Sequence, residues 1–366
     1  RFKWGVSGNW LDSDYGYAGQ SVGGLPSWTG GSPTPPLDRS IQTLVSGTQI
    51  GGYVASEFRP LEALTVETGV RWDRQTHTGE DQISPRVSLS HALGPASRIR
   101  AGWGRYYQSQ GLHELQVEDG VTGFFPAELA EHYVLGYERE FKRGLTIRAD
   151  AYLKRMSGLR PRFENLFSPF ELLPEFEPDR VEIDPDRAEA KGFDLTVARS
   201  AAGPFDWWAS YGRSSIEDAI DGQWVPRSWD QPHSLRFGLQ YRRGDRWECG
   251  LAGFYHTGWP TTSVSAASVQ NPDGSTTIVP VLGPRNGERY PDYHRLDARI
   301  GRHFRLGPGR LTLFAEVTNL YDRDNVCCVE DVEFLPQADG GVLVEREDGL
   351  WLQRVPTLGV IWRFEH

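Results

Sequence analysis

Long apolar runs, a cysteine framework and excess basic charge are all missing from this sequence of 366 residues. Without a run of about 18 apolar residues, the chain has no candidate transmembrane helix. Its 3 cysteines are too few for a disulfide scaffold. The opening segment RFKWGVSGNW lacks the apolar core of a secretory signal. The net charge of -10 argues against nucleic acid as a partner, because nucleic-acid binders present a basic face.

The main pattern that the sequence does contain is a period-two alternation of apolar and polar residues. In RLTLFAEVTNLYDRDN (310–325), Leu311, Leu313, Ala315 and Val317 alternate with polar residues, which is typical of a strand with one apolar and one wet face. The same pattern predicts about fourteen strands. They are expected near 1–10, 50–58, 63–73, 84–91, 98–107, 130–140, 144–155, 191–199, 205–215, 233–243, 246–256, 293–304, 310–320 and 354–364. Most are close to the 9–11 residues that a tilted membrane strand needs.

Short and long connections alternate along the chain. Short ones are expected at 59–62, 94–97, 142–144, 201–204, 244–245 and 306–309, and long ones at 11–49, 74–83, 108–129, 156–190, 216–232, 257–292 and 321–353. Outer-membrane barrels have this asymmetry, with tight periplasmic turns and long extracellular loops. The sequence therefore predicts an all-β, transmembrane, antiparallel up-and-down β-barrel over 1–366. The alternative is a soluble β-protein whose aromatic residues form its core.

Alternation also predicts which way the strand side chains point. Apolar sets such as Leu358, Val360, Trp362 and Phe364 are expected to face lipid, with aromatic residues near the strand ends. The opposite face carries charge of both signs, which requires a wet lumen or a polar body inside it. The luminal charges predicted here are Arg100, Glu138, Arg148, Asp150, Arg236, Arg295, Asp297, Arg299 and Glu316.

Five segments give the sequence a family resemblance. They are ELAEHYVLGYERE (128–140), LTIRADAYLKRMSGLRPRFENL (145–166), WDQPHSLRFGLQYR (229–242), LTLFAEVTNLYDRDN (311–325) and VPTLGVIWRF (355–364). In this order they resemble the C-terminal part of the β-barrel of TonB-dependent outer-membrane receptors. The resemblance implies a bacterial outer-membrane location, membrane lipid as the surroundings, and energised import of a scarce nutrient. It also implies a partner TonB complex, which acts through a plug domain.

Two departures from the family pattern bear on the extent of the chain. Nothing in the sequence resembles the plug domain or the TonB box, and fourteen strands are fewer than the 22 or so of a family barrel. We therefore expect a fragment of a 22-stranded barrel, seen without its plug. The alternative is a shorter, free-standing barrel that acts as a passive channel with a water-filled lumen.

Ligand contacts are expected in the exterior loops, because the strands form a scaffold. The candidate aromatic residues are Trp28, Trp224, Trp229, Trp259 and Tyr290, which can stack on sugar rings or aromatic chelates or, equally, brace the loops against one another. His113 and Glu114 lie in a loop long enough to fold inward and contact ligand or plug. A ferric siderophore or similar chelate, or an oligosaccharide, is the expected ligand.

No catalytic, cofactor or metal site is predicted. HEL (113–115) is not HExxH, because Val117 stands where the second histidine would be, and neither Gly-x-Ser-x-Gly nor a phosphate loop occurs. The acidic segment 156–190 matches no calcium-loop spacing and is interpreted as a solvated surface. Cys327-Cys328 is compatible with a vicinal disulfide, with pairing elsewhere or with a soft metal, and a structural role is favoured.

Overall fold

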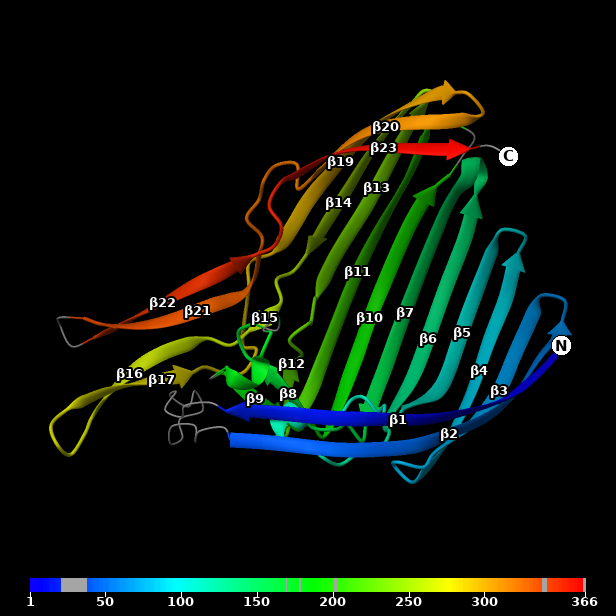
Figure 1. Cartoon of the computed structure of the whole chain (residues 1–366). Coiled ribbons are helices and arrows are strands. Elements are labelled where there is room, and N and C mark those ends of the chain that lie inside the picture. Colours follow the sequence, from blue (N-terminus) through cyan, green and yellow to red (C-terminus); the bar gives the residue numbers. More distant parts are fainter. Residues whose placement is uncertain are drawn as a thin grey trace.

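The computed structural model describes residues 1–20, 38–168, 170, 172–177, 179–200, 203–337 and 341–364. Its main sheet is built from fourteen consecutive antiparallel strands (Figure 1). These are β1 (Phe2–Gln20), β2 (Asp38–Leu61), β3 (Leu64–Gln75), β4 (Glu80–Gly94), β5 (Ser97–Gln108), β6 (Glu128–Phe141), β7 (Leu145–Ser157), β10 (Arg187–Arg199), β11 (Phe205–Ile220), β13 (His233–Arg243), β14 (Trp247–His256), β19 (Tyr293–Leu306), β20 (Gly309–Thr318) and β23 (Val355–Phe364). Each pairs with the next, so the fourteen strands expected from alternation are confirmed.

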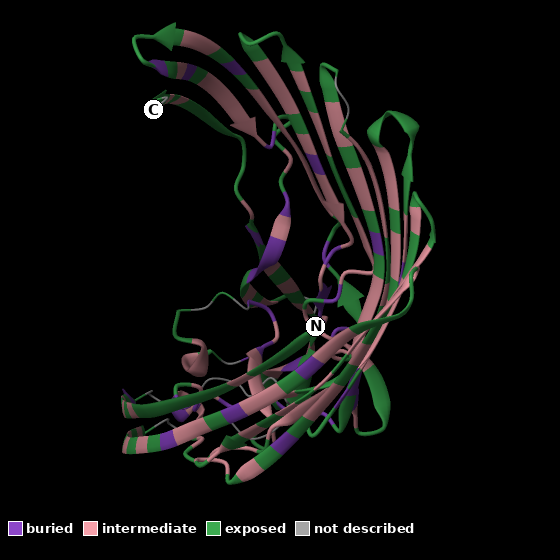
Figure 2. Ribbon diagram, turned by 90° about the vertical axis from the view of Figure 1, so that its right-hand side faces the viewer, coloured by how far each residue is buried: buried purple, intermediate pink, exposed green. Residues whose placement is uncertain are grey.

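The sheet curves into an open arc rather than a closed barrel, as Figure 2 shows. Within the described residues, β1 and β23 form its two edges. β12 (Gln223–Pro226) pairs with β11 outside the main path. No helix in the described part of the chain is long and apolar enough to cross a membrane.

The connections at the two ends of the strands differ as the sequence predicts. At one end the turns are tight: Leu306 pairs with Gly309, and Gly244 and Gly307 adopt φ of 59° and 58°, which is easy only for glycine. At the other end lie the long connections, except that β3 and β4 are joined by only the four residues 76–79. The expected long loop at 74–83 is therefore wrong in length.

The first hairpin corrects the expected loop at 11–49. β1 and β2 pair without interruption from Phe2↔Ser56 to Gln20↔Asp38, so 11–20 and 38–49 are strand. At about 3.4 Å per residue, β1 alone is roughly 65 Å long, whereas the apolar band of an outer-membrane barrel is about 25 Å tall. The outer halves of these strands need no lipid-facing apolar residues, so they carry no alternation by which the sequence could reveal them.

The long exterior connections form small sheets of their own. They contain β8 (Arg162–Asn165), β9 (Arg180–Ile183), β15 (Pro260–Thr261), β16 (Val264–Gln270), β17 (Thr276–Leu282), β18 (Glu288–Arg289), β21 (Val326–Pro336) and β22 (Val342–Leu350), and the short helices η1 (Val117–Asp119) and η3 (Pro174–Phe176), whereas η2 (Lys142–Gly144) lies in a tight turn. Their apolar side chains bury one another around Phe167, Tyr290 and Val329. This loop core brings buried apolar residues together outside the sheet, because the inner face of the sheet is polar.

Strand register fixes the two faces of the sheet. Arg100, Gly136, Asp150 and Asp194 stand opposite one another on consecutive strands and therefore share one face. Lys154 and Met156, which are on that face of β7, line a cavity together with loop residues, so the charged face is the inner one. The other face carries Leu358, Val360 and Trp362, whose exposed fractions are 84%, 65% and 49%. Exposed apolar residues at every second position are what a lipid-facing surface requires.

Candidate functional site

An aromatic pocket of about 350 Å³ lies where the outer ends of β13, β14 and β19 meet two exterior loops. Its lining residues come from both the strands and the loops. They are Ser234, Arg236, Phe254, Tyr255, His256, Trp259, Tyr293, Arg295 and Trp351. Trp259 and Trp351 come from loops 257–292 and 321–353, which the sequence places on the exterior.

The rings of this aromatic pocket form a continuous set. The His256 ring stacks on Tyr293 with 4.7 Å between centroids and 5° between planes, and lies 5.7 Å from Trp259. Trp259 in turn meets Trp229 and Trp351 edge-on, at 4.9 Å and 5.7 Å. Such contacts fix the ring orientations and leave flat apolar walls for a ligand.

Two arginines give the aromatic pocket positive charge. Arg295 lies 4.8 Å above the Phe254 ring and forms an ion pair of 3.3 Å with Asp297, while its buried Nε has no hydrogen-bond partner. Arg236 is exposed and has no ion pair within the described residues. The lining of the pocket thus includes two guanidinium groups and no carboxylate, although Asp292 accepts a hydrogen bond of 2.8 Å from the Tyr255 hydroxyl. The pocket therefore favours a ligand that combines flat rings with negative charge.

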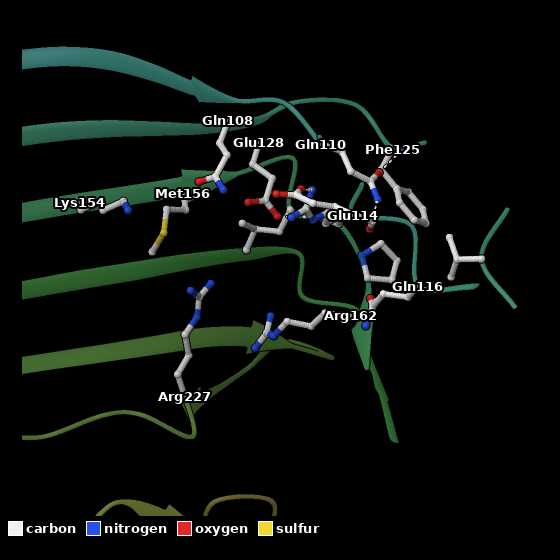
Figure 3. A pocket seen from close by; sticks show the side chains of 14 residues that line it. Gln108, Gln110, Glu114, Gln116, Phe125, Glu128, Lys154, Met156, Arg162 and Arg227 are labelled. Carbon is white, nitrogen blue, oxygen red and sulfur yellow. Dashed lines mark hydrogen bonds and ion pairs between the residues drawn. The ribbon is translucent and has the colours of Figure 1, made fainter. Parts of the chain in front are cut away.

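A second, polar cavity of about 440 Å³ lies on the inner face beneath the β5–β6 loop (Figure 3). Glu114 lines it, accepting a hydrogen bond from Gly111 N at 3.0 Å and lying 3.1 Å from Arg160. Burial alone would raise the pKa of Glu114, but the Gly111 hydrogen bond and the Arg160 charge outweigh it and lower the pKa. Arg162 and Arg227 line the opposite wall, as Figure 3 shows.

These two arginines belong to an arginine cluster that joins three exterior segments to β11. Both bind the buried carboxylate of Asp218, Arg162 at 2.6 Å and Arg227 at 2.8 Å. Glu164 pairs with Arg162 at 2.5 Å and with Arg285 at 2.8 Å. Burial opposes the charge of Glu164, but Arg162 and Arg285 outweigh burial and lower the pKa of Glu164.

Apart from Arg236, the predicted luminal charges form two groups of ion pairs on the inner face. In one, Arg100 lies 3.2 Å from Glu138 and 4.0 Å from Asp150, which also pairs with Arg148 at 2.5 Å. In the other, Arg299 pairs with Glu316 at 3.0 Å, next to the pair that Arg295 makes with Asp297. Pairing between neighbouring strands, and along one strand for Arg148–Asp150 and Arg295–Asp297, explains how charges of both signs coexist on one face.

The predicted exterior ligand residues separate in the structure. Trp259 lines the aromatic pocket and Trp229 packs against it, whereas Glu114 lines the polar cavity and His113 is exposed and lines neither. Trp224 lies on β12, 5.4 Å from the Arg187 guanidinium. Tyr290 is 6% exposed inside the loop core, so it braces the loops. Trp28 lies outside the described residues.

Sequence reasoning missed His256, Tyr293 and Trp351 as members of the aromatic pocket. His256 and Tyr293 directly oppose each other across β14 and β19. Their inward parity at the outer strand ends was a signal that could have found them. Trp351 had no such signal, because its position depends on how loop 321–353 folds back.

The three cysteines are free thiols in the described chain. Cys327 and Cys328 are buried where the pairing of β21 with β22 shifts register. Burial, together with the adjacent Cys327, raises the pKa of the Cys328 thiol to about 12. Such a thiol is protonated and unreactive at neutral pH, which fits a packing role. No group of three or more His, Cys, Asp or Glu side chains in the described residues is placed to hold a metal ion.

An up-and-down antiparallel sheet with a charged inner face, an apolar outer face and long loops at one end defines the class of transmembrane β-barrel proteins. Residues 1–320 match the family described as TonB dependent receptor-like, beta-barrel. The chain belongs to this family. A comparison with curated proteins gave no match.

Solved structures of the same fold include three outer-membrane proteins. P. aeruginosa FpvA bound to a pyoverdine is 15% identical, with a TM-score of 0.57 over 98% of this chain and 45% of that one. A mutant of the ferric enterobactin receptor PfeA from Pseudomonas aeruginosa is 14% identical, with a TM-score of 0.60 over 98% and 51%. The outer membrane transporter YddB from Escherichia coli is 12% identical, with a TM-score of 0.61 over 97% and 51%. The chain therefore spans about half the length of these proteins.

Proposed function

We propose that this chain is the ligand-receiving part of a TonB-dependent outer-membrane receptor that imports a ferric siderophore or a similar anionic chelate. The observation that carries the proposal is the aromatic pocket, in which Trp259, Trp351 and Tyr293 stand beside Arg236 and Arg295. Flat rings suit the aromatic groups of a chelate, and the two guanidinium groups suit its negative charge. Two proteins that share the fold are described with such ligands: FpvA as bound to a pyoverdine and PfeA as the ferric enterobactin receptor.

Transport of this kind makes and breaks no covalent bond. Ligand binding shifts the equilibrium of a plug domain inside the barrel, and it does so only as far as the ligand binds the two plug positions with different affinity. The ion-paired charges of the inner face would meet that plug. Because those charges are already paired with one another, they can exchange partners without leaving a buried charge uncompensated.

Tryptophan fluorescence titration tests the ligand class directly. Ferric enterobactin and ferric pyoverdine serve as probes with the detergent-purified chain, and maltoheptaose serves as the glycan probe. The expected result is saturable quenching by a ferric chelate, with a Kd that rises in the Trp259→Ala variant. Binding of maltoheptaose alone would overturn the chelate in favour of an oligosaccharide, and saturable binding of none of the three would overturn the receptor proposal.

A further inference from the structure

A shallow apolar groove of about 240 Å³ runs along the outer face of the sheet, away from the loops and the lumen. Six outward side chains shape it: Ile99, Leu135, Tyr137, Ala149, Ala151 and Phe193. All six stand at positions of β5, β6, β7 and β10 that alternate with the inward charges.

The groove exists because β7 carries two alanines between larger neighbours. Ala151 stands between Leu135 on β6 and Phe193 on β10, and Ala149 stands opposite Tyr137. Methyl groups on the floor and larger side chains on the walls leave a trough along β7. A trough of this shape is filled by a chain of methylenes rather than by a ring or a second flat sheet.

Two arginines flank the end of the trough that is nearer the tight turns. Arg139 on β6 faces outward one pair beyond Tyr137, opposite Ile147, and Arg199 on β10 faces outward opposite Leu145. Within the described residues neither forms an ion pair, and Arg139 lies 4.8 Å from the Phe141 ring. Lys142 and Arg143 in the adjoining turn add two more positive charges.

The spacing of these features matches a membrane phospholipid. Two strand residues span about 7 Å and four about 14 Å, so the arginines lie roughly 7–14 Å beyond the groove along the strand axis. That is the order of the distance between the phosphate of a lipid and the upper part of its acyl chains. The arginines also lie at the level of the tight turns, which face the periplasm in an outer-membrane barrel.

We propose that this surface binds a glycerophospholipid with an anionic headgroup from the inner leaflet of the outer membrane. One acyl chain lies in the trough over Ala149 and Ala151, and the phosphate lies between Arg139 and Arg199. The proposal rests on the outer-membrane location given in the proposed function, with the tight turns toward the periplasm. It concerns a different face from the aromatic pocket, so the two are tested separately.

Native mass spectrometry of the detergent-purified chain with dioleoylphosphatidylglycerol tests the site. Dioleoylphosphatidylcholine and lipid A are the comparison lipids. We expect the phosphatidylglycerol adduct to dominate. Arg139→Gln and Arg199→Gln should each weaken it about fivefold, the effect of roughly 1 kcal/mol per cation near a membrane surface. In Ala151→Leu the larger side chain occupies the trough. This variant should weaken phosphatidylglycerol binding about tenfold, the effect of roughly two lost methylene contacts.

The chain offers matched controls for both kinds of variant. Ala298 also faces outward, opposite Leu251, and Arg302 faces outward opposite Leu313 on β20, away from the groove. Ala298→Leu and Arg302→Gln should leave the adduct unchanged. Equal binding by the three test variants and the two controls, or preference for phosphatidylcholine or lipid A, would overturn the site. Because no ferric probe is present, this result is independent of nutrient binding.

Discussion

The hydroxyl of Tyr290 donates a hydrogen bond of 3.0 Å to the backbone carbonyl of Phe167, 123 residues away. The bond lies inside the loop core and ties loop 257–292 to loop 156–190. Burial raises the pKa of Tyr290 to about 12, so the hydroxyl stays protonated and remains a donor at neutral pH. The exterior loops are therefore held as one packed unit above the sheet.

Removing this contact should loosen the loops without unfolding the sheet. Tyr290→Phe should cost about 1 kcal/mol, the net value of one hydrogen bond. Tyr290→Ala should cost about 3–5 kcal/mol, because it also leaves a cavity. Hydrogen exchange of segments 160–168 and 326–330 measures the effect. Tyr241→Phe, on the outward face of β13, is the control. Unchanged exchange in Tyr290→Ala would show that the loop core does not depend on this ring.

Asp218 should be the most sensitive carboxylate of the arginine cluster. Its side chain is 2% exposed and compensates Arg162 and Arg227 at the same time. Asp218→Asn removes the carboxylate that pairs with Arg227 and leaves Arg162 with only Glu164, which Arg285 shares. The variant should destabilise the exterior segments by about 3–5 kcal/mol. Faster limited proteolysis within loop 156–190 is the expected sign. Asp245→Asn in a tight turn is the control, and an equal rate in both variants would contradict the assignment.

The lowered pKa of Glu164 predicts a loss of loop stability in acid. A carboxyl group whose folded pKa lies below its ordinary value of 4.5 stabilises the fold above that value. This stability is lost as the pH falls through the folded pKa. Loop proteolysis should therefore be constant from neutral pH to about 4.5 and should rise below it. Glu164→Gln should start from a higher rate and show a weaker acid response. An acid response equal to that of the parent chain would mean that other groups control it.

Variants of the aromatic pocket should change ligand affinity, and Trp259→Ala should also loosen the loops because Trp259 packs against the loop core. Trp259→Ala removes a ring that contacts three others, and stacking on one aromatic ring is worth about 1–3 kcal/mol. The Kd of a ferric chelate should rise roughly five- to 150-fold. Arg236→Gln should raise it less at high salt than at low salt, because the side chain is exposed. Trp208→Ala is the control, because Trp208 lies near the tight-turn end of β11 and does not line the aromatic pocket. Equal loss in Trp208→Ala would indicate a general folding defect.

The luminal ion pair of Arg100 and Glu138 should contribute little to stability. Their side chains are 35% and 29% exposed. An ion pair this accessible to solvent contributes at most about 1 kcal/mol to the free energy of unfolding. Glu138→Gln should therefore leave the thermal midpoint nearly unchanged. If the pair meets a plug, the same variant should slow uptake in cells that express the whole receptor. A large fall in midpoint with normal uptake would assign the pair to the sheet alone.

The aromatic pocket shows which residues of the site could be predicted from the sequence. Trp259, Arg236 and Arg295 were predicted from two separate arguments, one about exterior rings and one about inward charges, and the fold brings them into one pocket. Trp351 joins them only because loop 321–353 returns to the strand ends. Tyr290 was expected at the ligand surface as one of two alternatives and instead lies in the loop core.

The sequence by itself determined the sheet. Alternation assigns each side chain to lipid or lumen, because the side-chain period of a strand is two and each face has a different solvent. It could not determine the length of β1 and β2 beyond the membrane, where no lipid imposes a pattern. Only the tertiary structure decided which loop residues meet, as Phe167, Tyr290 and Val329 do. Contacts between residues more than 100 positions apart depend on the whole path of the chain, and no local pattern encodes that path.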